Sequence, residues 1–256
     1  FDIEKVTKNH LNSGAKVFTL GGDHSITFPI IKAHSKAYPK LDILHIDAHC
    51  DLYDNFEGDK YSHACPFARI MESKLAVKLI QVGIRTLNTH QAEQAEKFNV
   101  EIHQMKNLDL TKISRFENPL YISLDMDGFD PAFAPGVSHH EPGGLTSRQV
   151  IDLIQNIDAE VIGADIVEYN PNRDFQNMTA FLAAKMMKEI LVKMMDDTFY
   201  YGYLGKHALS SSSCKSLLES PEAYVAMLNK PPKEKEPQPF RDGRLIHLLS
   251  LEPHRI

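Results

Sequence analysis

A short apolar run that ends in histidine and acidic residues decides the fold: I-L-H-I-D-A-H-C-D, residues 43–51. Apolar runs of strand length bounded by Gly or Asp are typical of buried parallel strands. Further runs of this kind occupy residues 17–20, 79–82, 120–124 and 161–167. Helical stretches alternate with them, at residues 1–13, 26–38, 62–73, 89–98, 147–157 and 177–195. This alternation predicts an α/β fold of three αβα layers, in which helices cover both faces of a mostly parallel sheet.

The last part of the chain has a different character. After residue 195, neither the strand period nor the helix period persists, and Ser, Pro and mixed charge dominate, as in P-P-K-E-K-E-P at 231–237. Such composition is typical of loops and disordered segments. We therefore expect one domain over residues 1–195, followed by a tail, 196–256, that is disordered or foreign to the domain.

Composition excludes several classes of protein. The 256 residues carry 28 Lys and Arg against 34 Asp and Glu, a net charge of −6, which argues against nucleic-acid binding. No apolar run approaches the roughly 20 residues of a membrane span. Three widely spaced Cys indicate no disulfide framework, so we expect a reducing, cytoplasmic setting. The first residue is Phe rather than Met, and we expect the true start, with any mitochondrial transit peptide, to lie upstream.

Acidic and histidine residues cluster where two of the predicted strands end. Asp47, His49 and Asp51 are spaced i, i+2, i+4, so an extended segment presents them on one face. Asp125 and Asp127 repeat this spacing after the run at 120–124. Such positions line the crevice of an open α/β sheet. An Asp-rich turn is the simpler reading, but carboxylates beside a buried strand repel unless a cation neutralises them.

One more histidine completes the set. His24 lies in G-G-D-H-S, residues 21–25, directly after the first strand. Alone it would be an ordinary residue at a helix start. With the other five it gives two imidazoles, four carboxylates and no thiolate, a set that suits Mn²⁺, with Mg²⁺, Fe²⁺ or Co²⁺ as lesser options. Six ligands exceed the need of one ion and predict two ions that share a water for hydrolysis.

These motifs resemble the ureohydrolase family, the arginases and agmatinases. The resemblance rests on residues 21–25, 47–51 and 123–131 and continues through residues 132–145. Residues 61–64 and 137–142 are closest to the arginases of plants and their bacterial relatives. The resemblance implies the arginase-like fold, a homo-oligomer (trimer or hexamer), and a sheet whose N-terminal edge elements are missing from this chain.

The resemblance also implies a role for each residue. His63 matches the catalytic histidine that protonates the leaving amine, and Glu168 matches the carboxylate that pairs with the substrate guanidinium. Asn55 and His139 are expected near the other end of the substrate. The implied ligands of two Mn²⁺ ions, with Asp47 and Asp125 bridging, are His24, Asp47, Asp51 and Asp125 for the more buried ion and Asp47, His49, Asp125 and Asp127 for the other.

Three nearby polar residues are expected to have supporting roles. Ser123 would hydrogen-bond a metal-bound carboxylate, and Asp165 would support a ligand or the structure. His45 lies inside a strand and is expected to be a core histidine.

The implied activity is hydrolysis of a guanidino group to urea and an amine. The acidic loop 52–61 favours agmatine, which would give putrescine, over arginine, which would give ornithine; the likeness to plant arginases favours arginine. A zinc deacetylase of related fold and an inactive binding protein are more remote alternatives. We expect a small-molecule guanidino substrate and neither nucleic acid nor a membrane as partner.

Overall fold

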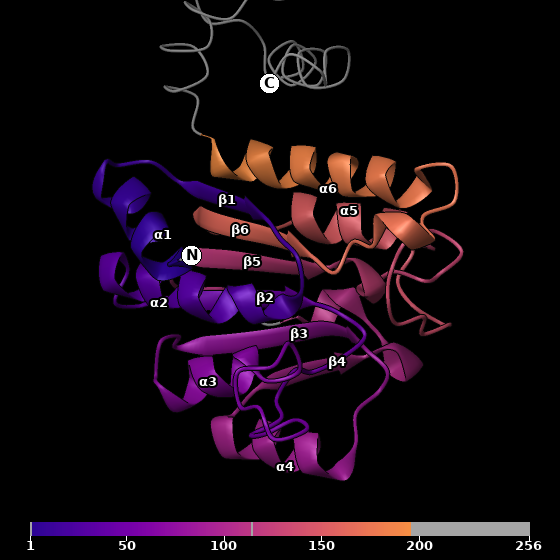
Figure 1. Ribbon diagram of the computed structural model, residues 1–256, viewed down its shortest axis with the longest axis horizontal. Helices are drawn as coiled ribbons and strands as arrows, with labels where there is room; N and C mark the ends of the chain where they lie inside the picture. The colour runs from indigo at the N-terminus through magenta and orange to yellow at the C-terminus, as the bar shows by residue number, and fades with distance from the viewer. Residues whose placement is uncertain (1, 114, 196–256) are drawn as a thin grey trace, which may run out of the picture. The chain divides into compact units, whose positions relative to one another are not determined.

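The computed structural model describes residues 2–113 and 115–195; the predicted tail, 196–256, lies outside the described residues. The strands are β1 (Val17–Leu20), β2 (Asp42–Ile46), β3 (Lys78–Ile84), β4 (Glu101–Gln104), β5 (Leu120–Asp125) and β6 (Val161–Val167). They form one parallel sheet in the order β1-β6-β5-β2-β3-β4 (Figure 1). The expected parallel α/β fold is therefore confirmed.

Helices cover both faces of this sheet. They are α1 (Ile3–Asn12), α2 (Thr27–Ala37), α3 (Pro66–Glu72), α4 (Thr89–Phe98), α5 (Ser147–Gln155) and α6 (Met178–Met194). Residues of α2, α3 and α4 form one apolar core with the sheet, and residues of α5 and α6 form the other. Along β2, Ile43 faces the first core and Leu44 faces the second, so the side chains of one strand serve both layers.

The structure differs from the sequence-based expectations at two elements. The strand β4 was not predicted, because E-I-H-Q is short, polar and half-buried at the sheet edge. The helix expected from residue 62 begins at Pro66, since Ser62–Cys65 closes a turn with a backbone hydrogen bond of 3.0 Å. The helix α5 begins after Thr146, which caps it in a capping box with Gln149.

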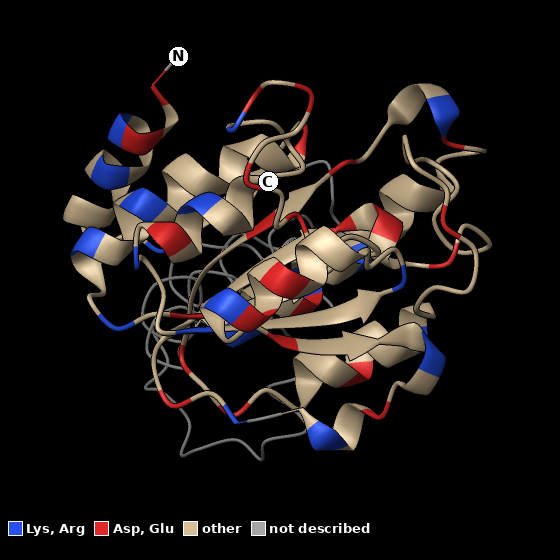
Figure 2. Cartoon of the chain, turned by 90° about the horizontal axis from the view of Figure 1, so that it is seen from below, with Lys and Arg blue, Asp and Glu red and all other residues tan. Residues whose placement is uncertain are grey.

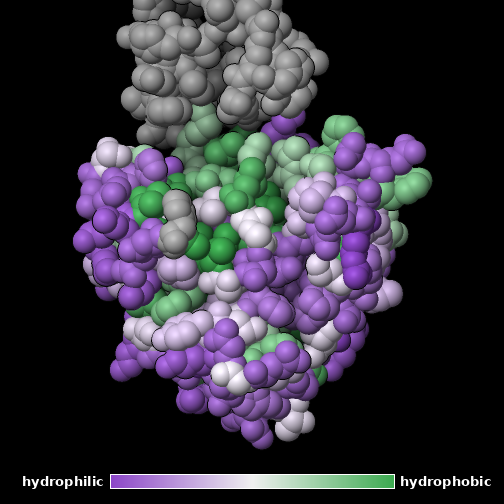
Figure 3. Space-filling model, viewed as in Figure 1, coloured by the Kyte–Doolittle hydropathy of each residue, from purple (hydrophilic) through white to green (hydrophobic). Residues whose placement is uncertain are grey.

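The surface of the described residues has no single dominant character. Figure 2 shows Lys and Arg interspersed with Asp and Glu along the helices of that view. Figure 3 shows apolar surface between α1 and α6, on the side that carries the edge strand β1, where Leu20 is exposed. Within residues 2–113 and 115–195, no helix combines the length and the hydrophobicity that crossing a membrane requires.

Candidate metal centre

The carboxyl ends of neighbouring parallel strands bring the first cluster together. Asp47 follows β2, Asp125 ends β5, and His24 begins a 3₁₀ turn (His24–Ile26) after β1. All three are buried. The Nδ1 atom of His24 lies 3.2 Å from Asp47 Oδ2, 3.1 Å from Asp51 Oδ2 and 3.2 Å from Asp125 Oδ2. Four residues separated by up to 101 positions thus converge on one point.

A second cluster shares Asp47 with the first. His49 Nδ1 lies 3.4 Å from Asp47 Oδ1 and 3.1 Å from Asp127 Oδ2. Asp125 is less clearly shared, because its Oδ1 accepts a 2.7 Å hydrogen bond from the Asp127 backbone N–H. The two oxygens of Asp47 therefore point to different histidines, which is the arrangement of a carboxylate between two cations.

The donor atoms fit divalent metal ions. His24 Nδ1 is buried, and none of its three carboxylate contacts has hydrogen-bond geometry, so this atom has no hydrogen-bond partner. Burial and the neighbouring charges of Asp127 and Asp47 raise the pKa of Asp125 well above its ordinary value. Burial, then Asp47, raises the pKa of Asp127 to about 7. A polar atom without a partner among mutually repelling carboxylates is the environment that a cation relieves.

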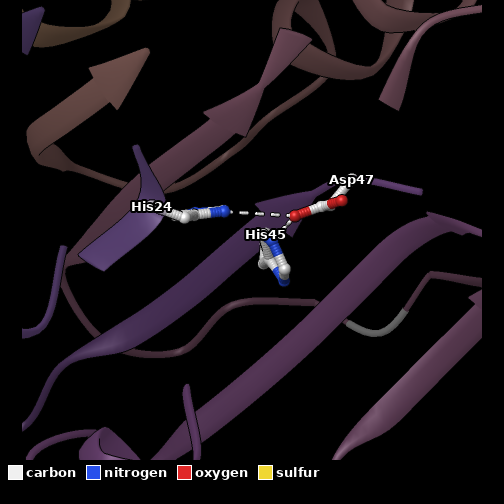
Figure 4. A group of neighbouring side chains, drawn as sticks. All are labelled: His24, His45 and Asp47. Carbon is white, nitrogen blue, oxygen red and sulfur yellow. Dashed lines mark hydrogen bonds and ion pairs between the residues drawn. The ribbon is translucent and has the colours of Figure 1, made fainter. Parts of the chain in front are cut away.

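His45 belongs to the core but touches the first cluster (Figure 4). With His24 and Asp47 it forms a group whose ligand atoms lie within 4.8 Å of one another; Asp47, His49 and Asp127 form another. Its ring stacks on Phe67 at 3.9 Å, its Nε2 lies 2.7 Å from Asp47 Oδ2, and its Nδ1 lies 2.9 Å from Gln81 Nε2. Both nitrogens of His45 are engaged, unlike Nδ1 of His24. His45 therefore orients Asp47, and Gln81, a residue that local sequence did not indicate, contacts the other nitrogen of His45.

A buried network supports His24 from its other nitrogen. His24 Nε2 lies 2.9 Å from Ser123 Oγ, which donates to Asp165 Oδ1 at 2.7 Å. Asp165 Oδ2 also accepts from Thr27 Oγ1 at 2.9 Å and Tyr121 Oη at 2.8 Å. Ser123 was expected to contact a carboxylate ligand, and this is wrong: its partners are the histidine and the supporting Asp165. Asp165 matches the expectation of a supporting role.

A cavity of about 200 Å³ opens beside the clusters, and its walls include His63, His139 and Glu168. The His63 and His139 rings stack with their centroids 6.0 Å apart. Glu168 Oε1 accepts a 2.9 Å hydrogen bond from the His24 backbone N–H, its φ is 62°, and burial raises its pKa. Asn55 is exposed, and its Oδ1 instead accepts from the Gly58 N–H at 2.8 Å. Lining residues that the sequence analysis did not single out include Tyr53, Phe56, Thr86 and Gln91.

Comparison with known proteins places the chain in a family. The family model described as "Arginase family" matches residues 2–193. The chain belongs to the arginase family. It is 49% identical over 184 residues to the mitochondrial arginase of Medicago truncatula, a match that covers 68% of this chain and 54% of that protein. It is 42% identical over 188 residues to the N(1)-aminopropylagmatine ureohydrolase of Thermus thermophilus, over 70% of this chain and 63% of that protein.

A solved structure agrees with this placement. The arginase from Medicago truncatula superposes with a TM-score of 0.72 and 45% identity, over 75% of this chain and 64% of that chain. The chain therefore spans between about half and two thirds of the length of these relatives. The arginase-like fold is confirmed.

Proposed function

We propose that this chain carries the active site of a two-manganese ureohydrolase, which cleaves a guanidino group to urea and an amine. One observation supports it above the others: the two oxygens of Asp47 face His24 and His49, each with further carboxylates around it. The six proposed ligands are His24, Asp47, His49, Asp51, Asp125 and Asp127. Imidazole and carboxylate donors without a thiolate favour Mn²⁺.

The chain's own residues would divide the work as follows. When held by these six residues, two Mn²⁺ ions would supply a nucleophilic water near neutral pH. Glu168 lies in the cavity with one oxygen held by the His24 N–H, which leaves the other free to pair with the substrate guanidinium. His63 lines the same cavity and is the proposed donor of a proton to the leaving nitrogen.

The tail of the substrate is proposed to be cationic, as in agmatine. Among the described residues that line the cavity, none is Lys or Arg. The cavity wall therefore offers no lysine or arginine side chain to pair with the α-carboxylate of arginine. Arginine is the second candidate, because the Medicago relative at 49% identity is named an arginase. Its α-carboxylate would need neutral donors such as Thr86 or Gln91.

Urea release with each substrate tests the proposal. The Mn²⁺-loaded protein is assayed with agmatine and with arginine, each alone and in competition. His63→Gln is expected to lower kcat by roughly 10²–10⁴-fold, whereas His10→Gln, an exposed histidine on α1, leaves it unchanged. Absence of urea from both substrates in a folded sample with two Mn²⁺ would refute the enzyme, and one zinc per chain would favour the deacetylase. A protein that holds substrate without turnover would be the inactive binding protein.

The organisation around this site is also proposed. Residues 1–195 would form the domain, and limited proteolysis should leave a stable fragment that ends near residue 195. The assembly would be a homo-oligomer, a trimer or hexamer, and a monomer in sedimentation equilibrium would contradict this. The compartment would be cytoplasmic, or mitochondrial as the name of the Medicago relative suggests, which cell fractionation distinguishes.

A further inference from the structure

One arginine beside the second cluster donates hydrogen bonds from all three guanidinium nitrogens to main-chain carbonyls. Arg85 follows β3, and its guanidinium makes five hydrogen bonds. Nε donates to the Glu141 carbonyl at 2.8 Å, and Nη2 donates to those of Asp127 at 2.6 Å and Phe129 at 3.1 Å. Nη1 donates to those of Gly83 at 3.1 Å and Gly128 at 3.2 Å.

These carbonyls belong to segments that the second cluster needs in place. Asp127 is one of its three residues, and Glu141 brings its Oε1 to 4.0 Å from Nε2 of His49. The backbone N–H of Arg85 itself bonds the Ala48 carbonyl at 2.9 Å, between Asp47 and His49. Arg85 therefore touches the main chain on both sides of the cluster and none of its ligand atoms.

The chain leaves room for this side chain. A Cβ on Gly144 would lie 2.7 Å from Arg85 Nη2 and 2.6 Å from the Asp130 nitrogen, so the backbone passes the guanidinium closely. Lysine cannot replace it, because an ammonium has three donors on one atom and cannot reach carbonyls spread around a planar fork.

We propose that Arg85 is a positioning residue for the second cluster: it holds the Asp127 main chain and the Glu141 segment against His49, and so sets how tightly the second metal ion is held. The inference rests on the two-metal centre of the proposed function. None of the five hydrogen bonds of the Arg85 side chain reaches a residue around His24. A positioning role therefore predicts weaker binding of the second ion alone, whereas a purely structural role would affect both ions.

Metal titration of the full chain tests this without any turnover. Mn²⁺ is added to chelator-treated wild type, Arg85→Met and Arg85→Lys, and bound Mn²⁺ is followed by electron paramagnetic resonance. Substitution of residues that support metal ligands typically weakens metal binding by roughly 10–100-fold. We expect a loss of that size for the second ion in Arg85→Met, while the first ion binds as it does in wild type. Arg85→Lys should also lose affinity for the second ion. Arg148→Met, an exposed arginine on α5 paired with Asp152, should bind both ions as wild type does.

A second variant probes the neighbouring segment around His139, which Arg85 does not contact. Arg173 Nη1 donates to the Ser138 carbonyl, next to His139, at 3.1 Å. Arg173→Met should therefore raise KM while the second ion stays bound, whereas Arg85→Met should weaken the ion and raise KM together.

The outcomes decide between readings. Unchanged affinity for the second ion in both Arg85 variants would overturn the inference, as would an equal loss of both ions. If Arg85→Met does not fold, Arg85→Lys decides on the same readout. Wild type that binds fewer than two ions would contradict the proposed metal centre itself and, with it, this inference.

Discussion

Between pH 5 and pH 7, the metal-free protein is expected to lose stability as the buried carboxyl group of Asp127 loses its proton. The side chain is 3% exposed, and burial together with the charge of Asp47 raises its pKa to about 7 from an ordinary value of 3.8. In the unfolded chain this group has already lost its proton at pH 5. The folded state therefore binds more protons than the unfolded state over this range, and rising pH favours unfolding.

The magnitude follows from the width of that range. One proton retained by the fold over about two pH units, at roughly 1.4 kcal/mol per unit, gives about 3 kcal/mol. Against the opposing effect of burial, Asp127 and Asp47 raise the pKa of His49 to about 12. The stabilisation of the fold by protonated His49 is complete below pH 6.5 and declines above it, so rising pH favours unfolding for this group as well. The two groups depend on each other, because the charge of His49 lowers the pKa of Asp127 that burial and Asp47 raise, so the two contributions are not added.

The comparison with Asp127→Asn isolates the effect, because burial lowers the pKa of His34 and His45 and these two act in the opposite direction. Urea denaturation of chelator-treated protein at pH 5, 6 and 7 should show wild type losing about 3 kcal/mol relative to Asp127→Asn. Asp152→Asn, exposed on α5, should follow wild type. Saturating Mn²⁺ should reverse the slope, since metal ions bind the deprotonated ligands. A constant difference between wild type and Asp127→Asn across this range would refute the reasoning.

Three further perturbations test the supporting structure. Asp165→Asn removes an acceptor from three buried hydroxyls and should cost about 2–4 kcal/mol of unfolding free energy in metal-free protein; exposed Asp158→Asn is the control, and equal stability of the two would contradict the network. Gly83→Ala, at φ 99° with its Cβ 2.8 Å from the Asp47 carbonyl, should cost about 2–3 kcal/mol or more. Gly14→Ala, at φ 82° with open space, should cost less, and the reverse order of their melting temperatures would exclude crowding at Gly83. Burial raises the pKa of the Cys50 and Cys65 thiols, that of Cys65 to about 11. In a Cys214→Ser variant, maleimide should therefore label these two thiols far more slowly in native than in unfolded protein. Equal rates would show that they are accessible.

The central strands and the main site motifs were predictable from the sequence for one physical reason. Strands buried on both faces are almost wholly apolar, so polar residues stand out at their ends, as Asp47 does after β2 and Asp125 does at the end of β5. The parallel order then brings those ends to the same edge. The strand β4 lacked this contrast, because an edge strand with one half-buried face has a mixed composition. Asn55, expected near the tail of the substrate, accepts a hydrogen bond from the Gly58 N–H of its own loop, and its role at the substrate stays a prediction.

The partners of the ligands were harder to predict than the ligands themselves. Ser123 alternates onto the face that meets Asp165 across the β5–β6 register, a pairing that depends on strand order rather than on local sequence. Gln81 reaches His45 through the β2–β3 register in the same way. Local spacing therefore indicates which residues can bind a metal, while the sheet topology decides which residues orient them.

Arg85 marks the limit of this kind of sequence reading. Side chains that bind metal or substrate leave a signature in residue type, because only a few types carry the required donors. A side chain that holds main-chain carbonyls leaves none, since every residue has a carbonyl and the partners Asp127 and Glu141 contribute theirs regardless of their side chains. The only trace in the sequence is indirect: Gly144, where a Cβ would meet the guanidinium. A glycine whose absent Cβ leaves space for a half-buried arginine thus indicates such a residue better than the arginine itself does.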